Sequence, residues 1–177
     1  SGAAVAVDPV PDGIALPLLG LVDELGLQLA YLLCTHAHDG EQRAIESLGA
    51  RSGARIAASE RAPVAADLRL RHGDTLEFGA ETIRVSGTPG HTPDCMCGLV
   101  SSEGEAQPRA VFTGDTLFVG SIGRPDLLEG RMTAATLASM GFDTWNNKLS
   151  KLADAVMVLP AHGAGSLCGA HLSDSPK

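Results

Sequence analysis

Aromatic residues and positive charges are both scarce in this chain of 177 residues. Phe, Trp and Tyr together make up 3% of it, with one Trp and one Tyr, so stacking platforms for bases or sugars are few. This composition disfavours RNA-recognition and carbohydrate-binding modules. The 13 Lys and Arg residues against 21 Asp and Glu give a formal net charge of −8. Such a balance argues against a nucleic-acid partner, because binding to phosphates depends on clustered cations.

Long apolar runs and a cysteine framework are also missing. The longest apolar run, residues 14–22, contains a proline and is far shorter than the about 20 residues that a membrane-spanning helix needs. No basic segment followed by an apolar stretch marks a secretory signal. The four cysteines are Cys34, Cys95, Cys97 and Cys168. Their irregular spacing favours reduced thiols over a disulfide framework and therefore predicts a cytoplasmic protein.

The remaining composition is that of a globular protein, with 44% hydrophobic and 19% charged residues. The length is typical of one domain, which commonly has about 100 to 200 residues, so we expect a single domain over residues 1–177. Predicted strands and helices alternate in the first third of the chain, which favours a layered α/β fold. The strands are 3–7, 29–35 and 55–58, and the helices are 17–27 and 41–52.

The rest of the chain is richer in short strands. A hairpin of strands 75–78 and 82–85 is followed by strands 97–100 and 110–113, a helical segment 133–152 and a last buried strand 155–159. The abrupt start at the strand 3–7 suggests that the fold's N-terminal strand is missing and that the chain is a fragment of a longer one.

Histidines gather at the ends of the predicted strands. Four of the six histidines and one aspartate follow directly on such strands: His36, His38, His91, His162 and Asp115. Ligands of layered α/β folds bind in loops at one edge of the sheet, so these five side chains predict one shared site. Neutral imidazole together with a carboxylate suits zinc or non-haem iron.

Four short motifs around these residues resemble the successive motifs of the metallo-β-lactamase superfamily, in family order. They are Thr35-His36-Ala37-His38, Thr88-Pro89-Gly90-His91-Thr92, Thr113-Gly114-Asp115-Thr116 and Pro160-Ala161-His162-Gly163. The stretches 112–118, 123–127 and 160–166 resemble the branch that holds persulfide dioxygenases and glyoxalase II-like proteins, which are often fused to rhodanese domains. The resemblance implies an αββα four-layer sandwich.

One motif departs from the family pattern. The family's first motif is HxHxDH, but Gly40 and Glu41 occupy its last two positions here, and in the dinuclear hydrolases those positions belong to the second metal site. The resemblance to persulfide dioxygenases implies a single Fe(II) per chain, held by His36, His91 and Asp115. This set matches the two-His, one-carboxylate triad of non-haem iron oxygenases, although zinc also accepts such ligands. A second ion bound by Glu41 with Asp115 and His162 is the alternative.

Further residues near these motifs have candidate roles. His38 and His162 are expected to hydrogen-bond metal-bound water or substrate, as catalytic residues beside the metal. Arg124 either binds a substrate carboxylate, such as that of glutathione, or pairs with Asp126. One of Cys95, Cys97 and Cys168 carries a persulfide, or all three are small buried hydrophobic residues.

The leading hypothesis is a persulfide dioxygenase that oxidises a low-molecular-weight persulfide, such as glutathione persulfide, to sulfite and thiol. A glyoxalase II-like thioester hydrolase is the second hypothesis, because a metal-bound hydroxide could attack a thioester. The third is a catalytically degenerate module of the same fold. The expected partners are a small-molecule thiol persulfide and dioxygen, a fused or separate rhodanese domain and further copies of the chain in a homo-oligomer. No nucleic acid and no membrane is expected to bind.

Overall fold

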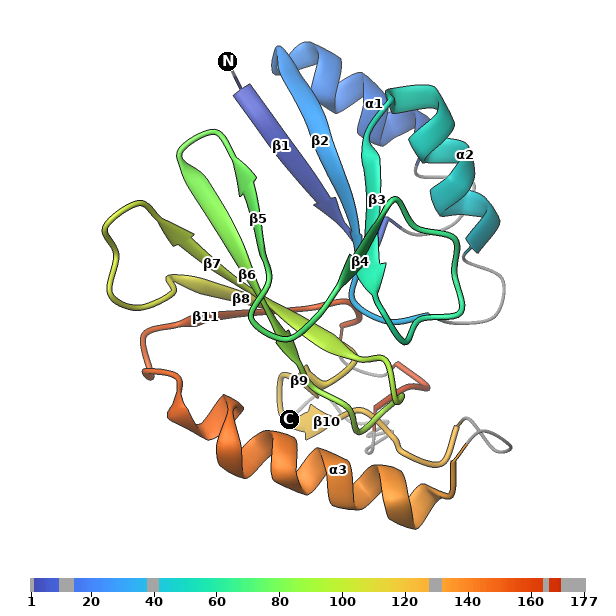
Figure 1. The fold of residues 1–177 in the computed structure, drawn as a ribbon, viewed down its shortest axis with the longest axis vertical. Coiled ribbons are helices and arrows are strands. Elements are labelled where there is room, and N and C mark those ends of the chain that lie inside the picture. Colours follow the sequence, from blue (N-terminus) through green and yellow to red (C-terminus); the bar gives the residue numbers. More distant parts are fainter. Residues whose placement is uncertain (1, 10–14, 38–41, 128–131, 164–165, 170–177) are drawn as a thin grey trace.

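A computed structural model describes residues 2–9, 15–37, 42–127, 132–163 and 166–169, and its described strands form two main sheets (Figure 1). The first sheet is parallel and has the order β1-β2-β3-β4. Its strands are β1 (Gly2–Val7), β2 (Leu27–Cys34), β3 (Arg55–Ser59) and β4 (Leu68–Leu70). The strand β4 lies outside the predicted strands, because its three residues give too short a pattern to recognise.

The second sheet has the order β11-β8-β7-β6-β5. Its strands are β5 (Thr75–Phe78), β6 (Glu81–Gly87), β7 (Met96–Ser102), β8 (Ala110–Gly114) and β11 (Met157–Pro160). Neighbours are antiparallel except β11, which runs parallel to β8. A short ribbon of β9 (Leu117–Phe118) and β10 (Ser121–Ile122) follows β8. The predicted hairpin and the strands after it are therefore confirmed.

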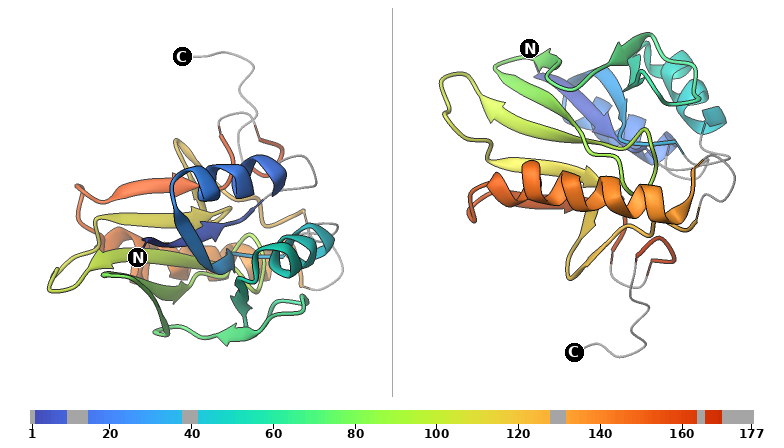
Figure 2. Two further views of the ribbon diagram at one scale, coloured as in Figure 1. Left: turned by 90° about the horizontal axis from the view of Figure 1, so that it is seen from above. Right: turned by 60° about the horizontal axis from the view of Figure 1, so that its bottom comes forward.

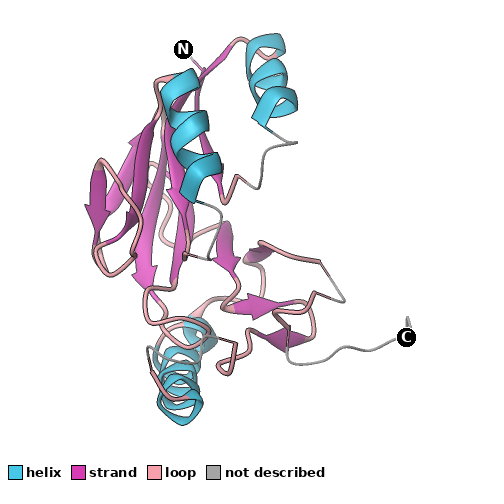
Figure 3. Ribbon diagram, turned by 90° about the vertical axis from the view of Figure 1, so that its right-hand side faces the viewer, coloured by secondary structure: helices cyan, strands magenta, loops and turns pink. Residues whose placement is uncertain are grey.

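Two helices cover the outer face of the first sheet. α1 (Ala15–Glu24) joins β1 to β2, and α2 (Gln42–Ser52) joins β2 to β3, so both crossovers return to the same face. Figure 3 shows the two helices along one side of the strands. The predicted helix 17–27 begins two residues later and ends three residues later than α1. Its end was misplaced because Gly26 adopts a positive φ of 63° that ends the helix and leads directly into β2.

The main core lies between the two sheets. Alternate residues of β7 face opposite sides of the second sheet. Met96 and Val100 pack inward with Leu33 and Ala57 of the first sheet. Leu99, between them, packs on the opposite face. This alternation is what the pleat of a strand requires when both faces are covered.

The outer face of the second sheet is covered by the helical segment that follows β10. This segment consists of α3 (Ala134–Asn147) and the 3₁₀ turn η1 (Leu149–Lys151) (Figure 2). Thr133 caps α3 by accepting a hydrogen bond from the backbone N–H of Thr136, and Leu149 packs on Val111 of β8. Helices therefore lie on both sides of two stacked sheets, which confirms the predicted αββα sandwich.

The prediction of a buried last strand was wrong. In β11 the exposed fraction is 62% for Met157 and 36% for Val158. β11 pairs only with β8 among the described strands, so it forms an edge of the sheet. Its apolar sequence misled the prediction, since an apolar run gives no information about edge position. Among the described residues, no helix is long and apolar enough to cross a membrane.

Candidate metal centre

The candidate site lies where four strands of the two sheets end. His36 follows β2, His91 lies in the loop between β6 and β7, Asp115 follows β8 and His162 follows β11. In the second sheet β6, β8 and β11 run in the same direction, so their carboxyl ends reach one edge. The structure thus brings together four of the five side chains that the sequence predicted to share a site.

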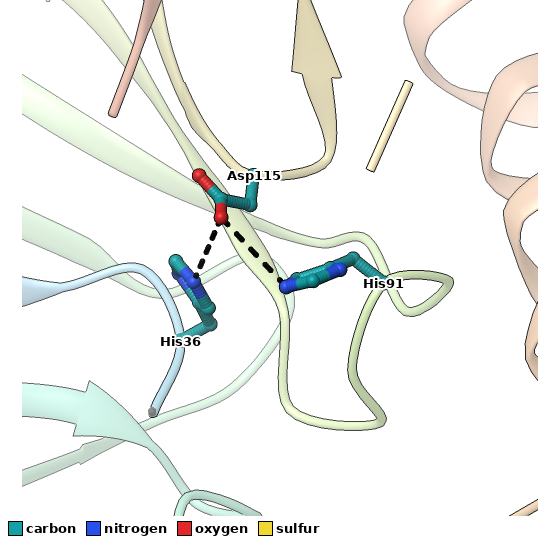
Figure 4. Close-up of side chains that lie close together, drawn as sticks. All are labelled: His36, His91 and Asp115. Atoms are coloured by element: carbon teal, nitrogen blue, oxygen red, sulfur yellow. Dashed lines mark ion pairs between the residues drawn. The ribbon is translucent and has the colours of Figure 1, made fainter. Parts of the chain in front are cut away.

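Asp115 is the centre of this cluster. Its carboxylate is fully buried, and Oδ2 lies 3.6 Å from Nε2 of His36 and 3.7 Å from Nε2 of His91. The two imidazole rings meet nearly edge to face, with their centroids 5.5 Å apart. Figure 4 shows the three side chains pointing toward one another from separate segments of the chain. All three are buried, and the three candidate ligand atoms lie within 4.8 Å of one another.

The hydrogen bonds around His36 fix the position of its ring proton. Asp8 accepts hydrogen bonds from the backbone N–H and the hydroxyl of Thr35, both at 2.7 Å. The hydroxyl has one hydrogen, and a carboxylate can only accept, so this hydrogen points to Asp8. Thr35 Oγ1 must therefore accept at its contact of 2.9 Å with Nδ1 of His36. The proton sits on Nδ1, so in the neutral ring the Nε2 lone pair faces Asp115.

His91 reaches the same state through a different partner. Its Nδ1 lies 2.8 Å from the backbone carbonyl oxygen of Arg124. A carbonyl oxygen only accepts, so Nδ1 carries the proton, and in the neutral ring Nε2 presents a lone pair. Partners of this kind are typical of metal-binding histidines, because they fix the tautomer and the orientation of the ring.

This arrangement has the chemistry of a cation site. Two imidazole lone pairs and one carboxylate oxygen converge in a buried space, and the separations of 3.6 and 3.7 Å are longer than hydrogen bonds. Ligand atoms around zinc or iron lie about 3 to 3.5 Å apart when the metal–ligand distances are about 2.0 to 2.2 Å. The donor set therefore fits one divalent ion of this kind, with little movement of the side chains.

The other oxygen of the carboxylate faces a second group of residues. Oδ1 of Asp115 lies 2.7 Å from Nδ1 of His162, whose side chain is 34% exposed. The partly buried thiol of Cys168 lies near both, because candidate ligand atoms of Asp115, His162 and Cys168 also lie within 4.8 Å of one another. The sequence analysis named Cys168 as a candidate persulfide carrier but did not predict that it lies beside Asp115.

The side chain of Arg124 pairs with Asp126, which is the simpler of the two roles predicted for it. Its Nε and Nη2 contact the two carboxylate oxygens of Asp126 at 3.0 and 2.5 Å. This pair lowers the pKa of the Asp126 carboxyl, chiefly through the hydrogen bond from Arg124. The backbone of Arg124 does more for the site, since its carbonyl orients His91 and its N–H donates to the carbonyl oxygen of Cys168.

Cys95 and Cys97 are buried core residues, in line with the simpler interpretation of them. Burial raises the pKa of the Cys95 thiol to about 12 and that of Cys97 to about 11. Thiolate is the nucleophilic form of cysteine, so neither side chain is suited to accept a sulfur atom at neutral pH.

Two predicted residues lie outside the described part of the chain. These are His38 and Glu41, so their expected roles beside the metal and in a second metal site are not tested by the geometry.

Sequence analysis did not identify two residues that shape the site. Asp8 accepts a hydrogen bond from the hydroxyl of Thr35, and Asp94 accepts one from the backbone N–H of Ala37 at 2.9 Å. Neither aspartate belongs to a recognisable sequence motif, because the residue that it contacts lies more than 25 residues away in sequence.

Comparison with known proteins identifies the family. Residues 46–162 match the family model of the metallo-beta-lactamase superfamily. The chain belongs to the metallo-β-lactamase superfamily. Among relatives, it is 31% identical over 163 residues to the mitochondrial persulfide dioxygenase ETHE1 of Homo sapiens, covering 92% of this chain and 59% of the relative. It is also 36% identical over 160 residues to the hydroxyacylglutathione hydrolase of Albidiferax ferrireducens, covering 90% of this chain and 57% of that protein.

Solved structures of the superfamily agree with this assignment. ETHE1 from Myxococcus xanthus matches with a TM-score of 0.79 and 32% identity, over 94% of this chain and 68% of that one. A metallo-beta-lactamase from Staphylococcus aureus matches with a TM-score of 0.81 and 30% identity, over 95% of this chain and 51% of that one. The chain spans about three fifths of the length of the curated relatives described above.

Proposed function

We propose that this metallo-β-lactamase-superfamily chain is a non-haem iron persulfide dioxygenase that oxidises a low-molecular-weight persulfide, such as glutathione persulfide, to sulfite and thiol. One observation carries the proposal: two imidazole Nε2 atoms and one carboxylate oxygen converge on one point, each with a lone pair directed there. His36, His91 and Asp115 would hold one Fe(II). The similarity to proteins named persulfide dioxygenase supports this reaction.

A set of two histidines and one carboxylate suits this chemistry. Held by these residues, a ferrous ion would supply open coordination positions for a substrate sulfur and for dioxygen. The reaction balances when one persulfide, one dioxygen and one water give one thiol, one sulfite and two protons. The terminal sulfur is oxidised, dioxygen is reduced, and the sulfur–sulfur bond breaks.

The chain's own residues orient and neutralise this centre. Thr35 and the Arg124 carbonyl hold the two imidazole rings in the tautomer that presents Nε2. The buried carboxylate of Asp115 offsets part of the charge of a divalent cation. His162 holds a proton between its Nδ1 and Oδ1 of Asp115, and its partial exposure gives that proton a route to solvent.

Arg124 is proposed to bind a carboxylate of the substrate. Its side chain is 33% exposed, and its planar fork already holds a carboxylate, that of Asp126, through two contacts. A glutathione carboxylate would take the place of Asp126 on the same fork. His38 keeps its proposed role beside the metal, on the strength of the motif alone.

Oxygen uptake by iron-loaded protein tests the proposal. Protein reconstituted without oxygen with one equivalent of Fe(II) should consume one dioxygen and form one sulfite for each glutathione persulfide. His91→Ala should abolish both. His72→Ala is the matched control, because it removes an exposed imidazole outside the site. Sulfite formation that does not consume oxygen, or that survives in His91→Ala, would contradict the proposal.

A thioester hydrolase is the second candidate. The similarity to a hydroxyacylglutathione hydrolase and the contact of Asp115 with both His91 and His162 favour it. Hydrolysis of S-lactoylglutathione that proceeds equally well without oxygen, with no uptake of oxygen on persulfide, would establish this reaction in place of the first.

A further inference from the structure

A cavity of about 250 Å³ lies beside the loop that carries His91, outside the metal centre. Pro89 and Pro93 of this loop line the cavity, whereas none of the candidate metal ligands does. We propose that the cavity binds a small organic anion, with the anionic group between Lys148 and Arg61 and the apolar part against the inner wall. This inference is independent of the proposed oxygenase reaction.

The inner wall of the cavity is apolar. It is lined by the buried side chains of Leu70, Val85 and Met96, which come from β4, β6 and β7. A ligand can bury carbon atoms against these side chains, and the burial of apolar surface is a main favourable contribution to binding. Sites for drug-sized ligands have volumes of about 300 to 1,000 Å³, so this cavity suits a more compact molecule.

Cations outnumber carboxylates around the rest of the cavity. Lys148, which follows α3, and Arg61, which follows β3, both line it. Among the residues that the structure describes, neither has a carboxylate within 4.0 Å. Glu60 supplies the one carboxylate of the described lining, and it is already paired with Arg71 at 2.8 Å. The cavity therefore has an excess of positive charge, although the chain has a net charge of −8.

The ammonium group of Lys148 is held in an unfavourable environment. The side chain is half-buried, and its Nζ donates a hydrogen bond to the backbone carbonyl oxygen of Gly87, which fixes its position. Burial lowers the pKa of Lys148, and the nearby charge of Arg61 lowers this pKa further. A bound anion would offset the repulsion between the two cations, because an opposite charge stabilises the charged form of both. Groups in such environments cluster at functional sites.

The two cations also have hydrogen-bond donors for the oxygens of an anion. An ammonium group has three donors, and the Gly87 carbonyl takes one of those of Lys148. The guanidinium of Arg61 has five donors in a planar fork, which matches the oxygens of a phosphate or a carboxylate. Together with the apolar inner wall, these donors favour a ligand that has an anionic oxygen group on a small apolar body.

Calorimetric titration with phenyl phosphate tests the proposal, because this probe joins a phosphate group to a compact apolar ring. The metal-loaded protein should bind one equivalent of it. Inorganic phosphate has only the anionic group and phenol only the ring, so each should bind at least tenfold more weakly. The absence of saturable binding would overturn the proposal. Inorganic phosphate that binds as tightly as phenyl phosphate would overturn the assignment of an organic ligand.

Variants of the two cations locate the probe. Arg61→Gln changes an exposed side chain and should weaken binding of phenyl phosphate at least tenfold, whereas Arg55→Gln, exposed at the start of the same strand β3, should bind like wild type. Lys148→Met should weaken binding as strongly, and Lys151→Met, exposed one turn later, should not. Equal affinities of Arg61→Gln and Arg55→Gln would contradict the proposal.

His91→Ala separates this cavity from the metal centre. Binding of phenyl phosphate should survive in this variant, because His91 does not line the cavity. Loss of binding would assign the probe to the metal centre and overturn the inference. Failure of the oxygenase proposal would appear instead as absent oxygen uptake in iron-loaded protein and would leave binding of phenyl phosphate unchanged.

Discussion

At the scale of single residues, the candidate site is defined by where protons are held. Asp8 is in an unusual left-handed conformation for a residue with a side chain, with φ 44°, and from there its carboxylate reaches Thr35. Thr35 in turn sets the tautomer of His36. A chain of three residues, starting in a turn after β1, thus prepares one imidazole nitrogen to bind a cation.

Removing the Thr35 hydroxyl tests this chain. In Thr35→Val the ring of His36 loses the acceptor that holds its Nδ1 proton. Metal affinity should fall about 10- to 100-fold, the range found when such supporting residues are lost. Competition with a chromogenic chelator measures it. Thr82→Val is the control, because it makes the same replacement at a hydroxyl that donates to the backbone carbonyl of Ser101, away from the candidate ligands. Equal affinities of the two variants would show that Thr35 does not set the tautomer.

At the scale of elements, glycines let the loops of the site approach one another. A Cβ on Gly123 would lie 1.9 Å from the backbone oxygen of Asp115 and 2.8 Å from Cβ of His91. A Cβ on Gly90 would lie 2.8 Å from Cα of Gly141, where the His91 loop packs against α3. The loops meet at backbone distance, so these positions tolerate no side chain.

Gly123→Ala should therefore disturb two candidate ligands at once. Overpacking commonly costs about 1 to 3 kcal/mol, and here the backbone beside Asp115 or the His91 side chain must also move. We expect a lower melting temperature and a loss of bound metal, measured by calorimetry and elemental analysis. In Gly163→Ala the new methyl group meets nothing within 4 Å, although the residue follows His162 directly, so that variant should keep both. Normal metal content in Gly123→Ala would contradict this account of the loops.

At the scale of the whole molecule, local patterns predict a layered α/β fold and the family resemblance implies its αββα order, but neither predicts the contacts between distant segments. Alternating strands and helices predicted the first sheet, and the motifs predicted that His36, His91 and Asp115 gather. The positions of Asp8 and Cys168 next to the site could not be predicted, because their neighbours there are distant in sequence and meet them only in the folded chain. The exposure of β11 also depends on its place at the sheet edge, which its own residues do not encode.

Burial of the thiols predicts how the stability of the whole chain depends on pH. Desolvation raises the pKa of Cys95 to about 12 and that of Cys97 to about 11, from 9.0. Between pH 9 and these values, the folded protein keeps protons that the unfolded chain has lost, so the free energy of unfolding is full below about pH 9 and falls as the pH rises.

Each buried thiol contributes at most about 1.4 kcal/mol per pH unit to this slope. Urea unfolding at a series of alkaline pH values measures it. Cys97→Ala should reduce the slope by the share of one proton, whatever its effect on stability at neutral pH. A slope that Cys97→Ala leaves unchanged would mean that this thiol ionises alike in the folded and unfolded chains, and the core around β7 would then admit water.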